Sequence, residues 1–337
     1  MKGAEIMKNK KMKTAFKIIL SVFAAVAIFI IALLLLVLHK WDDVPQEYET
    51  DNPFISELGE TTVSAHRSGA GIFPENTMMA FEGCIANDTF NTDIFEFDIH
   101  ITKDEQLILL HDDTLDRTTN SRKVFGVENA RPEDYTYEEL RQLNFGEGFV
   151  TDDGQTPYKG IEGDAVPENL KASRLQDVLS FLEENGGFRY IIEIKNGDAL
   201  GRKATDILYE ILKEKGLLDK AIVGTFNGEI TKYINDTYPD MVRSSGIVEV
   251  VIVYLAALLD IELPEEFFSF VALQVPYDTP ILDLCTPRFV NYAHKNNVAV
   301  QYWTVNDPDI ISFLESIGTD SITTDIPDIV YSILNES

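Results

Sequence analysis

Residues 93–111 read DIFEFDIHITKDEQLILLH, and this stretch decides the fold. It holds two β-rich runs, 93–99 and 106–111, with only residues 100–105 between them. A crossover between parallel strands needs a dozen or more residues, so the second run must fold back on the first as the arm of a hairpin. Apolar side chains occupy both faces of the first run, as in a buried parallel strand. We therefore expect a central strand with a hairpin arm outside the sheet.

Further β-rich runs alternate with helical patterns along the rest of the chain, which is typical of a parallel sheet. Once the hairpin arm is set aside, eight strands remain in a body of roughly 280 residues, the usual size of a (β/α)8 barrel. The sequence therefore predicts an α/β fold, a TIM barrel over residues 59–337. The expected strands are 61–65, 93–99, 188–194, 220–225, 241–246, 269–275, 298–304 and 319–323.

The loop after the second strand is long for a compact domain. It continues from the hairpin arm to about residue 172 and contains one helical pattern, at 136–143. Loops of this length are often lids or insertions, and loops that follow barrel strands lie at the mouth that holds the chemistry. We predict an insertion at about 113–172 that influences the choice of substrate.

The N-terminal region predicts a membrane anchor. Residues 18–38 form an uncharged apolar run of 21 residues, long enough to span a bilayer as a helix. A cleaved signal peptide is the alternative, but its apolar core would be shorter and a small-residue cleavage site would follow it. Residues 1–17 are rich in lysine and residues 42–51 in acids, which predicts a cytoplasmic basic tail. We expect a single-pass cell-membrane protein with a stalk at 39–58 and an extracytoplasmic catalytic domain.

The overall charge restricts the partners. The chain has 28 basic and 56 acidic residues and a net charge of −28. Nucleic-acid binding depends on Lys and Arg contacts to phosphates, so nucleic acid is not expected as a partner. No obligate protein partner is implied. Cys84 and Cys285 stand in no metal-ligand spacing, and the sequence leaves open whether they pair.

Acidic residues on the strands indicate a metal site. Glu96 and Asp98 stand two apart and therefore share one face of the second strand. Two inward carboxylates repel each other unless a cation compensates them, and oxygen ligands suit Mg²⁺ or Ca²⁺. Glu193 is a further inward carboxylate and could complete the ligand set, with Lys195 two residues later available to neutralise a phosphate.

Two histidines follow strands or strand-like runs. His66 and Arg67 end the first strand, and His111 ends the hairpin arm. Two histidines can transfer protons to and from a reacting phosphodiester, and a guanidinium group binds phosphate oxygens in bidentate fashion.

The strings AHRSGAGIFPENTMMAF at 65–81 and FEFDIHITKDEQLILLHDDTLDRTT at 95–119 resemble the signature of the glycerophosphodiester phosphodiesterase family. Shorter pieces follow in the family's order: IEIK at 192–195, TF at 225–226, WTVN at 303–306 and TTDIP at 323–327. The resemblance covers about residues 61–334.

The resemblance implies hydrolysis of glycerophosphodiesters to glycerol 3-phosphate and an alcohol. The implied mechanism has the metal activate the neighbouring glycerol hydroxyl, which attacks phosphorus in line; a cyclic phosphate, where one forms, is then hydrolysed. The implied roles are acid/base catalysis by His66 and His111, substrate binding by Arg67, Lys195 and Trp303, and metal binding by Glu96, Asp98 and Glu193.

Alternative activities remain open at this point. They are a phospholipase-type lyase that stops at the cyclic phosphate, and action on lysophospholipids or glycerol-phosphate polymers. A catalytically silent scaffold is disfavoured because the implied catalytic residues are all present.

Two features depart from the family's pattern, and one of them is segment 120–172, which is longer than a minimal member would need. Ser68 replaces the family's usual glycine after His-Arg, which affects the geometry of that turn. Asp112 and Asp325 are candidates to support the catalytic groups, whereas Glu75 and Asn76 are expected to start a helix rather than to contact the substrate.

Overall fold

The computed structural model describes residues 16–28, 30–31 and 43–336. The chain divides into two compact units. The larger begins at Val44 and holds the strands; the smaller holds the described residues before it, which are largely helical, together with residues 281–283.

The predicted membrane span lies only partly within the described residues. In residues 18–38, position 29 and positions 32–38 fall outside them. Among the helices that are described, none is both long enough and apolar enough to cross a membrane. The anchor therefore stays a prediction.

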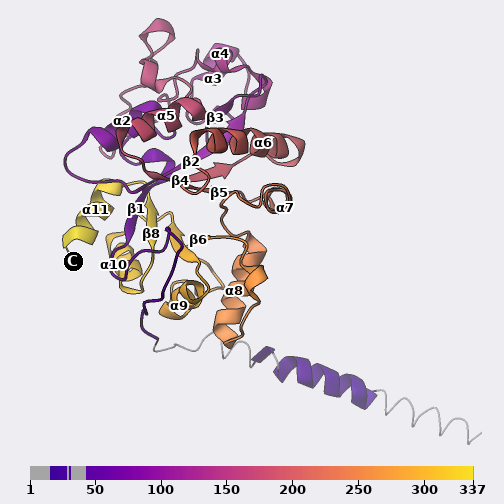
Figure 1. Cartoon of the computed structure of the whole chain (residues 1–337). Coiled ribbons are helices and arrows are strands. Elements are labelled where there is room, and N and C mark those ends of the chain that lie inside the picture. Colours follow the sequence, from indigo (N-terminus) through magenta and orange to yellow (C-terminus); the bar gives the residue numbers. More distant parts are fainter. Residues whose placement is uncertain (1–15, 29, 32–42, 337) are drawn as a thin grey trace, which may run out of the picture. The chain divides into compact units, whose positions relative to one another are not determined.

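A parallel sheet curls into a barrel within the larger unit (Figure 1). Its strands lie side by side in the order β5-β4-β2-β1-β8-β7-β6, and each neighbouring pair is parallel. The strands are β1 Thr62–Ala65, β2 Ile94–Ile101, β4 Arg189–Ile194, β5 Ala221–Gly224, β6 Ala272–Pro276, β7 Ala299–Trp303 and β8 Ser321–Thr324.

A short segment lies in the gap between β5 and β6 and bridges to both strands. The sequence predicts a full strand at 241–246, but the structure has only two parallel bridges there, Val223 to Arg243 and Ser244 to Ala272. The predicted strand was too long because the segment is mostly polar and has few apolar side chains to pack on both faces. The barrel is therefore nearly closed and agrees with the predicted TIM-barrel class.

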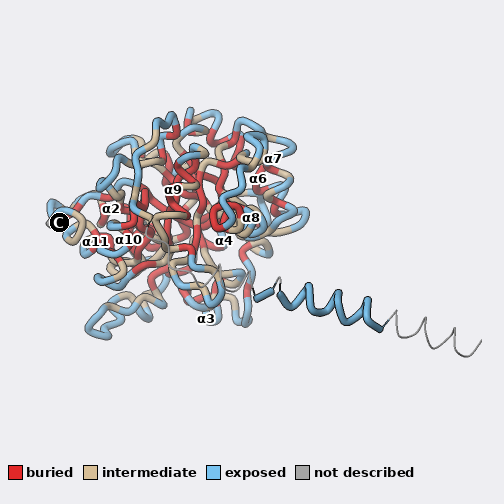
Figure 2. Tube along the Cα trace, turned by 90° about the horizontal axis from the view of Figure 1, so that it is seen from below, coloured by how far each residue is buried: buried red, intermediate tan, exposed pale blue. Residues whose placement is uncertain are grey.

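A helix follows each barrel strand and packs outside the sheet, as the alternation predicts. Buried residues gather between the sheet and these helices (Figure 2). The helices are α2 Met78–Ala86, α5 Leu175–Asn185, α6 Asp198–Lys215, α7 Gly228–Thr237, α8 Ile247–Leu259, α9 Pro287–Lys295, α10 Pro308–Ser316 and α11 Pro327–Glu336; a short 3-10 turn, η5 Glu265–Phe267, precedes β6.

The hairpin arm is confirmed. Strand β3, Leu107–Leu109, pairs antiparallel with the end of β2. The insertion that follows has a small core of its own, with Leu115, Leu140 and Phe145 buried in it. The helical pattern at 136–143 becomes α4 Tyr137–Leu140, which opens on a capping box between Thr136 and Glu139. The other short helices here are α3 Ser121–Phe125, η2 Pro132–Asp134, η3 Gly163–Ala165 and η4 Glu168–Leu170.

Residues 44–58 do not form the free stalk that the sequence suggests. They cross the face of the barrel where the strands begin. Asn52 donates to the carbonyl oxygens of Val271 and Asn297, and the Ser56 amide donates to Asp320. Phe54 is buried among residues at the starts of the strands. This segment, called the lower strap below, belongs to the barrel because its apolar residues and amides find partners there.

Candidate active site

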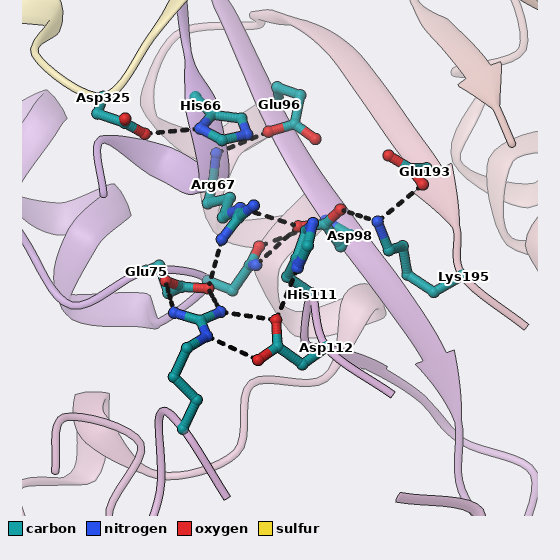
Figure 3. A network of polar contacts seen from close by, with 12 residues as sticks. His66, Arg67, Glu75, Glu96, Asp98, His111, Asp112, Glu193, Lys195 and Asp325 are labelled. Atoms are coloured by element: carbon teal, nitrogen blue, oxygen red, sulfur yellow. Dashed lines mark hydrogen bonds and ion pairs between the residues drawn. The ribbon is translucent and has the colours of Figure 1, made fainter. Parts of the chain in front are cut away.

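Three carboxylates meet at the mouth of the barrel, where the strands end. Glu96 and Asp98 project from one face of β2, and Asp98 pairs in register with Glu193 of β4. Oxygen atoms of the three residues lie within 4.8 Å of one another. The structure thus brings together all three predicted metal ligands (Figure 3).

Burial and crowding disturb these acids. Burial, and after it the charge of Asp98, raises the pKa of Glu96. The same two causes raise the pKa of Glu193. An excess of buried negative charge of this kind favours a bound cation, and carboxylate oxygens suit a hard divalent ion. The donor set therefore fits Mg²⁺ or Ca²⁺.

Two basic side chains reach the cluster. Lys195 Nζ lies 2.8 Å from Glu193 Oε1 and 3.3 Å from Asp98 Oδ1. Arg67 donates its backbone amide to Glu96 Oε2 at 2.7 Å. Its buried side-chain Nε lies 3.9 Å from Asp98 Oδ2 and has no hydrogen-bond partner within the described part of the chain. A buried donor in that state is available to a phosphate oxygen.

His66 is held by a carboxylate from the far end of the chain. Its Nδ1 lies 2.6 Å from Oδ1 of Asp325, which follows β8, and Asn306 donates to the other oxygen of Asp325. Burial alone would lower the pKa of His66, but the hydrogen bond to Asp325 and the charge of Glu96 outweigh it, so this pKa is raised. His66 therefore keeps its proton to a higher pH than an exposed histidine.

His111 has a carboxylate partner of its own. Its Nδ1 lies 2.7 Å from Oδ1 of the next residue, Asp112. The mouth therefore carries two histidines, each oriented through Nδ1 by an aspartate, which leaves Nε2 of each ring for chemistry. The sequence pattern named both aspartates as possible supports, and the contacts confirm that they touch the histidines.

Glu75 and Asn76 were assigned to a helix start, and this was wrong. The N-cap of α2 is Thr77, whose side chain accepts from the Ala80 amide. Asn76 is buried and donates Nδ2 to Asp98 Oδ2 at 3.0 Å. Glu75 lies 3.2 Å from Arg67 Nη1. No residue spacing signals these contacts, because they depend on a turn with positive φ at Asn76.

The turn after β1 keeps the geometry that the family's glycine would favour. Ser68 has φ of +67° and Arg67 has φ of +47°. Ser68 is buried, and its hydroxyl has no hydrogen-bond partner among the residues that the structure describes. A serine at this positive φ carries backbone strain that a glycine would not.

An aromatic wall lies beside the mouth. Trp303 ends β7 and meets Phe226, which follows β5, edge-on with ring centroids 5.7 Å apart. Phe226 also lines a pocket of about 580 Å³ between α7 and α8, together with the exposed side chains of Ile247 and Val248. Trp303 thus lies at the end of a barrel strand, and its part in substrate binding stays a prediction.

The fold and the site define a TIM barrel with a cluster of carboxylates and histidines at its mouth. Comparison with known proteins narrows this class. The model of the glycerophosphoryl diester phosphodiesterase family matches residues 66–329. A glycerophosphodiester phosphodiesterase of Bacillus altitudinis is 26% identical over 276 residues, which cover 82% of this chain and 99% of the relative. One from Caldanaerobacter subterraneus subsp. tengcongensis is 25% identical, with coverage of 82% and 99%.

A solved structure shows the same fold. A phosphodiesterase of Oleispira antarctica, in complex with the product sn-glycerol-3-phosphate, superposes with a TM-score of 0.61 at 19% identity, covering 81% of this chain and 96% of that one. The chain belongs to the glycerophosphoryl diester phosphodiesterase family.

Proposed function

We propose that this chain hydrolyses glycerophosphodiesters to glycerol 3-phosphate and the free alcohol, using one divalent cation, Mg²⁺ or Ca²⁺. The observation that carries the proposal is the meeting of three carboxylates and two histidine–aspartate pairs at one barrel mouth. Glu96, Asp98 and Glu193 would hold the cation. When bound, it supplies positive charge that stabilises the phosphorane-like transition state and acidifies the attacking hydroxyl.

The chain's own residues supply the rest of the chemistry. Arg67 and Lys195 neutralise the phosphate oxygens, since both cations lie at the carboxylate cluster. His66 and His111 divide the proton transfers: one accepts the proton of the attacking glycerol hydroxyl and the other donates one to the leaving alcohol oxygen. Water then opens the cyclic phosphate to give glycerol 3-phosphate, with the same two histidines transferring the protons. Each depends on its aspartate to keep the reactive Nε2 directed into the mouth.

The test is hydrolysis of glycerophosphocholine, glycerophosphoethanolamine and glycerophosphoglycerol by the purified full chain, with Mg²⁺, Ca²⁺ or a chelator. Glycerol 3-phosphate should form only with metal, and His66→Gln and Glu96→Gln should abolish it. The matched control is His294→Gln, which breaks the buried His294–Asp320 pair at the opposite end of the barrel and should leave kcat unchanged. Metal-independent turnover, or full activity in Glu96→Gln, would refute the proposal.

The same assay separates hydrolase from lyase. Phosphorus NMR of the products distinguishes glycerol 3-phosphate from a stable cyclic phosphate. A cyclic phosphate that persists after the substrate is consumed would show that the chain is a lyase and not a hydrolase.

One observation favours lipid-bearing substrates as a second candidate. Phe226, Ile247 and Val248 form an exposed apolar wall next to Trp303; their exposed fractions are 57%, 62% and 72%. Such a surface can receive the acyl chain of a lysophospholipid. Val248→Asp should then lower activity on lysophosphatidylcholine and spare activity on glycerophosphocholine. Equal effects on both substrates would remove this candidate.

We further propose that residues 18–38 anchor the chain in the cell membrane with the catalytic domain outside. The long uncharged run and the basic residues before it support this. Fractionation of cells and protease treatment of intact cells test it: the full chain should sediment with membranes, and the barrel should be digested from outside.

A further inference from the structure

Arg117 lies between two carboxylates at the mouth. Its Nε and Nη2 lie 2.6 and 2.8 Å from the two oxygens of Asp112, and its Nη1 and Nη2 lie 2.6 and 2.7 Å from the two oxygens of Glu75. All three guanidinium nitrogens are therefore engaged. The planar fork of arginine matches this double bidentate arrangement, and a lysine ammonium does not.

Each of these carboxylates also contacts a group assigned to the reaction. Asp112 Oδ1, which receives Arg117, also contacts His111 Nδ1. Glu75 Oε1, which receives Arg117, also contacts Arg67 Nη1. One guanidinium group thus connects a histidine after β3 with an arginine after β1 (Figure 3 shows Glu75 and Asp112 beside these two groups).

The backbone of Arg117 is fixed by the insertion. Leu115 is fully buried in the insertion's core, and its carbonyl accepts from the amide and the hydroxyl of Thr119. A Cβ atom at Gly148 would lie 2.0 Å from the Arg117 carbonyl oxygen, so the two backbones pass as closely as glycine permits. The position of the guanidinium is therefore set by the fold of the insertion.

A nearby arginine shows the contrast. Arg122 contacts Asp116 at 3.0 Å, and its side chain is 61% exposed. Because the guanidinium is exposed, this ion pair contributes little to stability, and within the described part of the chain the Arg122 side chain contacts no group of the mouth. Arg122 therefore provides a control of equal charge from the same insertion.

We propose that Arg117 is a positioning residue for the phosphodiesterase reaction: through Asp112 it orients the ring of His111, and through Glu75 it orients the guanidinium of Arg67. The inference rests on the proposed function, because it names a role in that same site. Without Arg117, Glu75 and Asp112 lose the cation that they share, and both partners gain rotational freedom. Misplacement of a reacting group by about 1 Å can cost on the order of 100-fold in rate.

Kinetics provide the first test. Arg117→Met should lower kcat/KM by roughly 10- to 100-fold, whereas Arg122→Met should stay near the wild-type value. Arg117→Lys keeps the positive charge but lacks the planar guanidinium, so its kcat/KM should lie between those of Arg117→Met and the wild type. If the methionine variant does not fold, the lysine variant provides the test. Wild-type kcat/KM in a folded Arg117→Met or Arg117→Lys variant would overturn the proposal.

A double-mutant cycle tests the route through Asp112. If Arg117 acts through that carboxylate, the loss in Arg117→Met/Asp112→Asn should be clearly smaller than the product of the two single losses. Losses that simply multiply would show that Arg117 acts elsewhere. A second double-mutant cycle, with Arg117→Met and Glu75→Gln, tests the contact through Glu75 in the same way.

A measurement without substrate separates this proposal from the proposed function. Nitrogen-15 NMR of the histidine rings, with His111 assigned by its loss in His111→Gln, reports which ring nitrogen carries the proton. The wild type should show His111 protonated at Nδ1, facing Asp112, and Arg117→Met or Arg117→Lys should show a mixture of tautomers while His294 is unchanged. Unaltered His111 shifts in both variants would refute the positioning role, whatever the enzyme hydrolyses.

Discussion

Asn76 and Asp98 form a closed pair beneath the mouth: Asn76 Nδ2 donates to Asp98 Oδ2 at 3.0 Å, and the Asp98 amide donates back to Asn76 Oδ1 at 3.3 Å. Both residues are almost completely buried. The amide therefore fixes the side chain of a proposed metal ligand, so Asn76→Ala should weaken Mg²⁺ or Ca²⁺ binding by roughly 10- to 100-fold. Calorimetric titration of the metal measures this. Asn87→Ala, which alters only local contacts at the end of α2, is the control and should bind metal normally.

The stability of the metal-free protein should fall as the pH rises. Burial raises the pKa of Glu96 and of Glu193 in the folded state, so between the unfolded value near 4.5 and the folded pKa the folded chain holds more protons than the unfolded one. Unfolding free energy decreases with pH in that window. Melting temperatures in chelator should therefore be lower at about pH 8.5 than at about pH 5.5.

Metal should reverse this trend, because it binds the ionised carboxylates. The stabilisation by Mg²⁺ or Ca²⁺ should grow with pH, and Glu96→Gln should flatten the pH dependence in chelator. His66, whose pKa is also raised, adds a decline of the same sign at higher pH, and this decline should shrink in Glu96→Gln because the charge of Glu96 helps to raise the His66 pKa. A metal-free protein that is equally stable at both pH values would contradict the predicted crowding of buried charge.

Ser68→Gly should stabilise the fold. Ser68 has a positive φ and a buried hydroxyl without a hydrogen-bond partner in the described structure. Glycine adopts this backbone without strain and removes the buried hydroxyl, and the gain should be about 1 kcal/mol. Urea denaturation measures it, with kcat expected within a factor of about two of wild type because the turn already follows the same path. A loss of stability would show that the hydroxyl has a role that the contacts do not reveal.

Phe54→Ala should destabilise the barrel without changing its chemistry. Phe54 is 3% exposed, packs among the starts of the strands and lies under Arg189 at 5.6 Å. Loss of a buried phenylalanine costs about 3–5 kcal/mol. Thermal unfolding should show this, while kcat below the transition stays unchanged because the mouth lies at the other end of the strands. The exposed Val44 provides a matched control at the start of the same segment, and Val44→Ala should have little effect.

Much of the fold follows from periodicity. The hairpin arm was predictable because six residues cannot make a parallel crossover, and the helices were predictable from their apolar faces and caps. The strand at 241–246 was not, because the number of bridges it forms depends on packing against β5 and β6. The lower strap was also missed, since a polar segment with two prolines looks the same whether it is free or docked.

In the candidate site, too, some residues were predictable from the sequence and others were not. Glu96, Asp98 and Glu193 were predictable because strand alternation and barrel geometry direct side chains of known spacing toward one mouth. Asn76, Glu75 and Arg117 were not, because their contacts depend on a left-handed turn and on the path of a long insertion. The local sequence shows the type of each of these residues, but it does not show how close their side chains come to the groups at the ends of the strands.

The lower strap lies at the opposite end of the barrel from the reacting groups. The strap, residues 44–58, lies at the end of the barrel where the strands start, and the reacting groups lie where the strands finish. A tag or another carrier joined ahead of the strap should therefore leave the geometry of the reactive centre unchanged. The barrel should therefore keep its activity when it is attached to a different carrier, as long as the strap is kept.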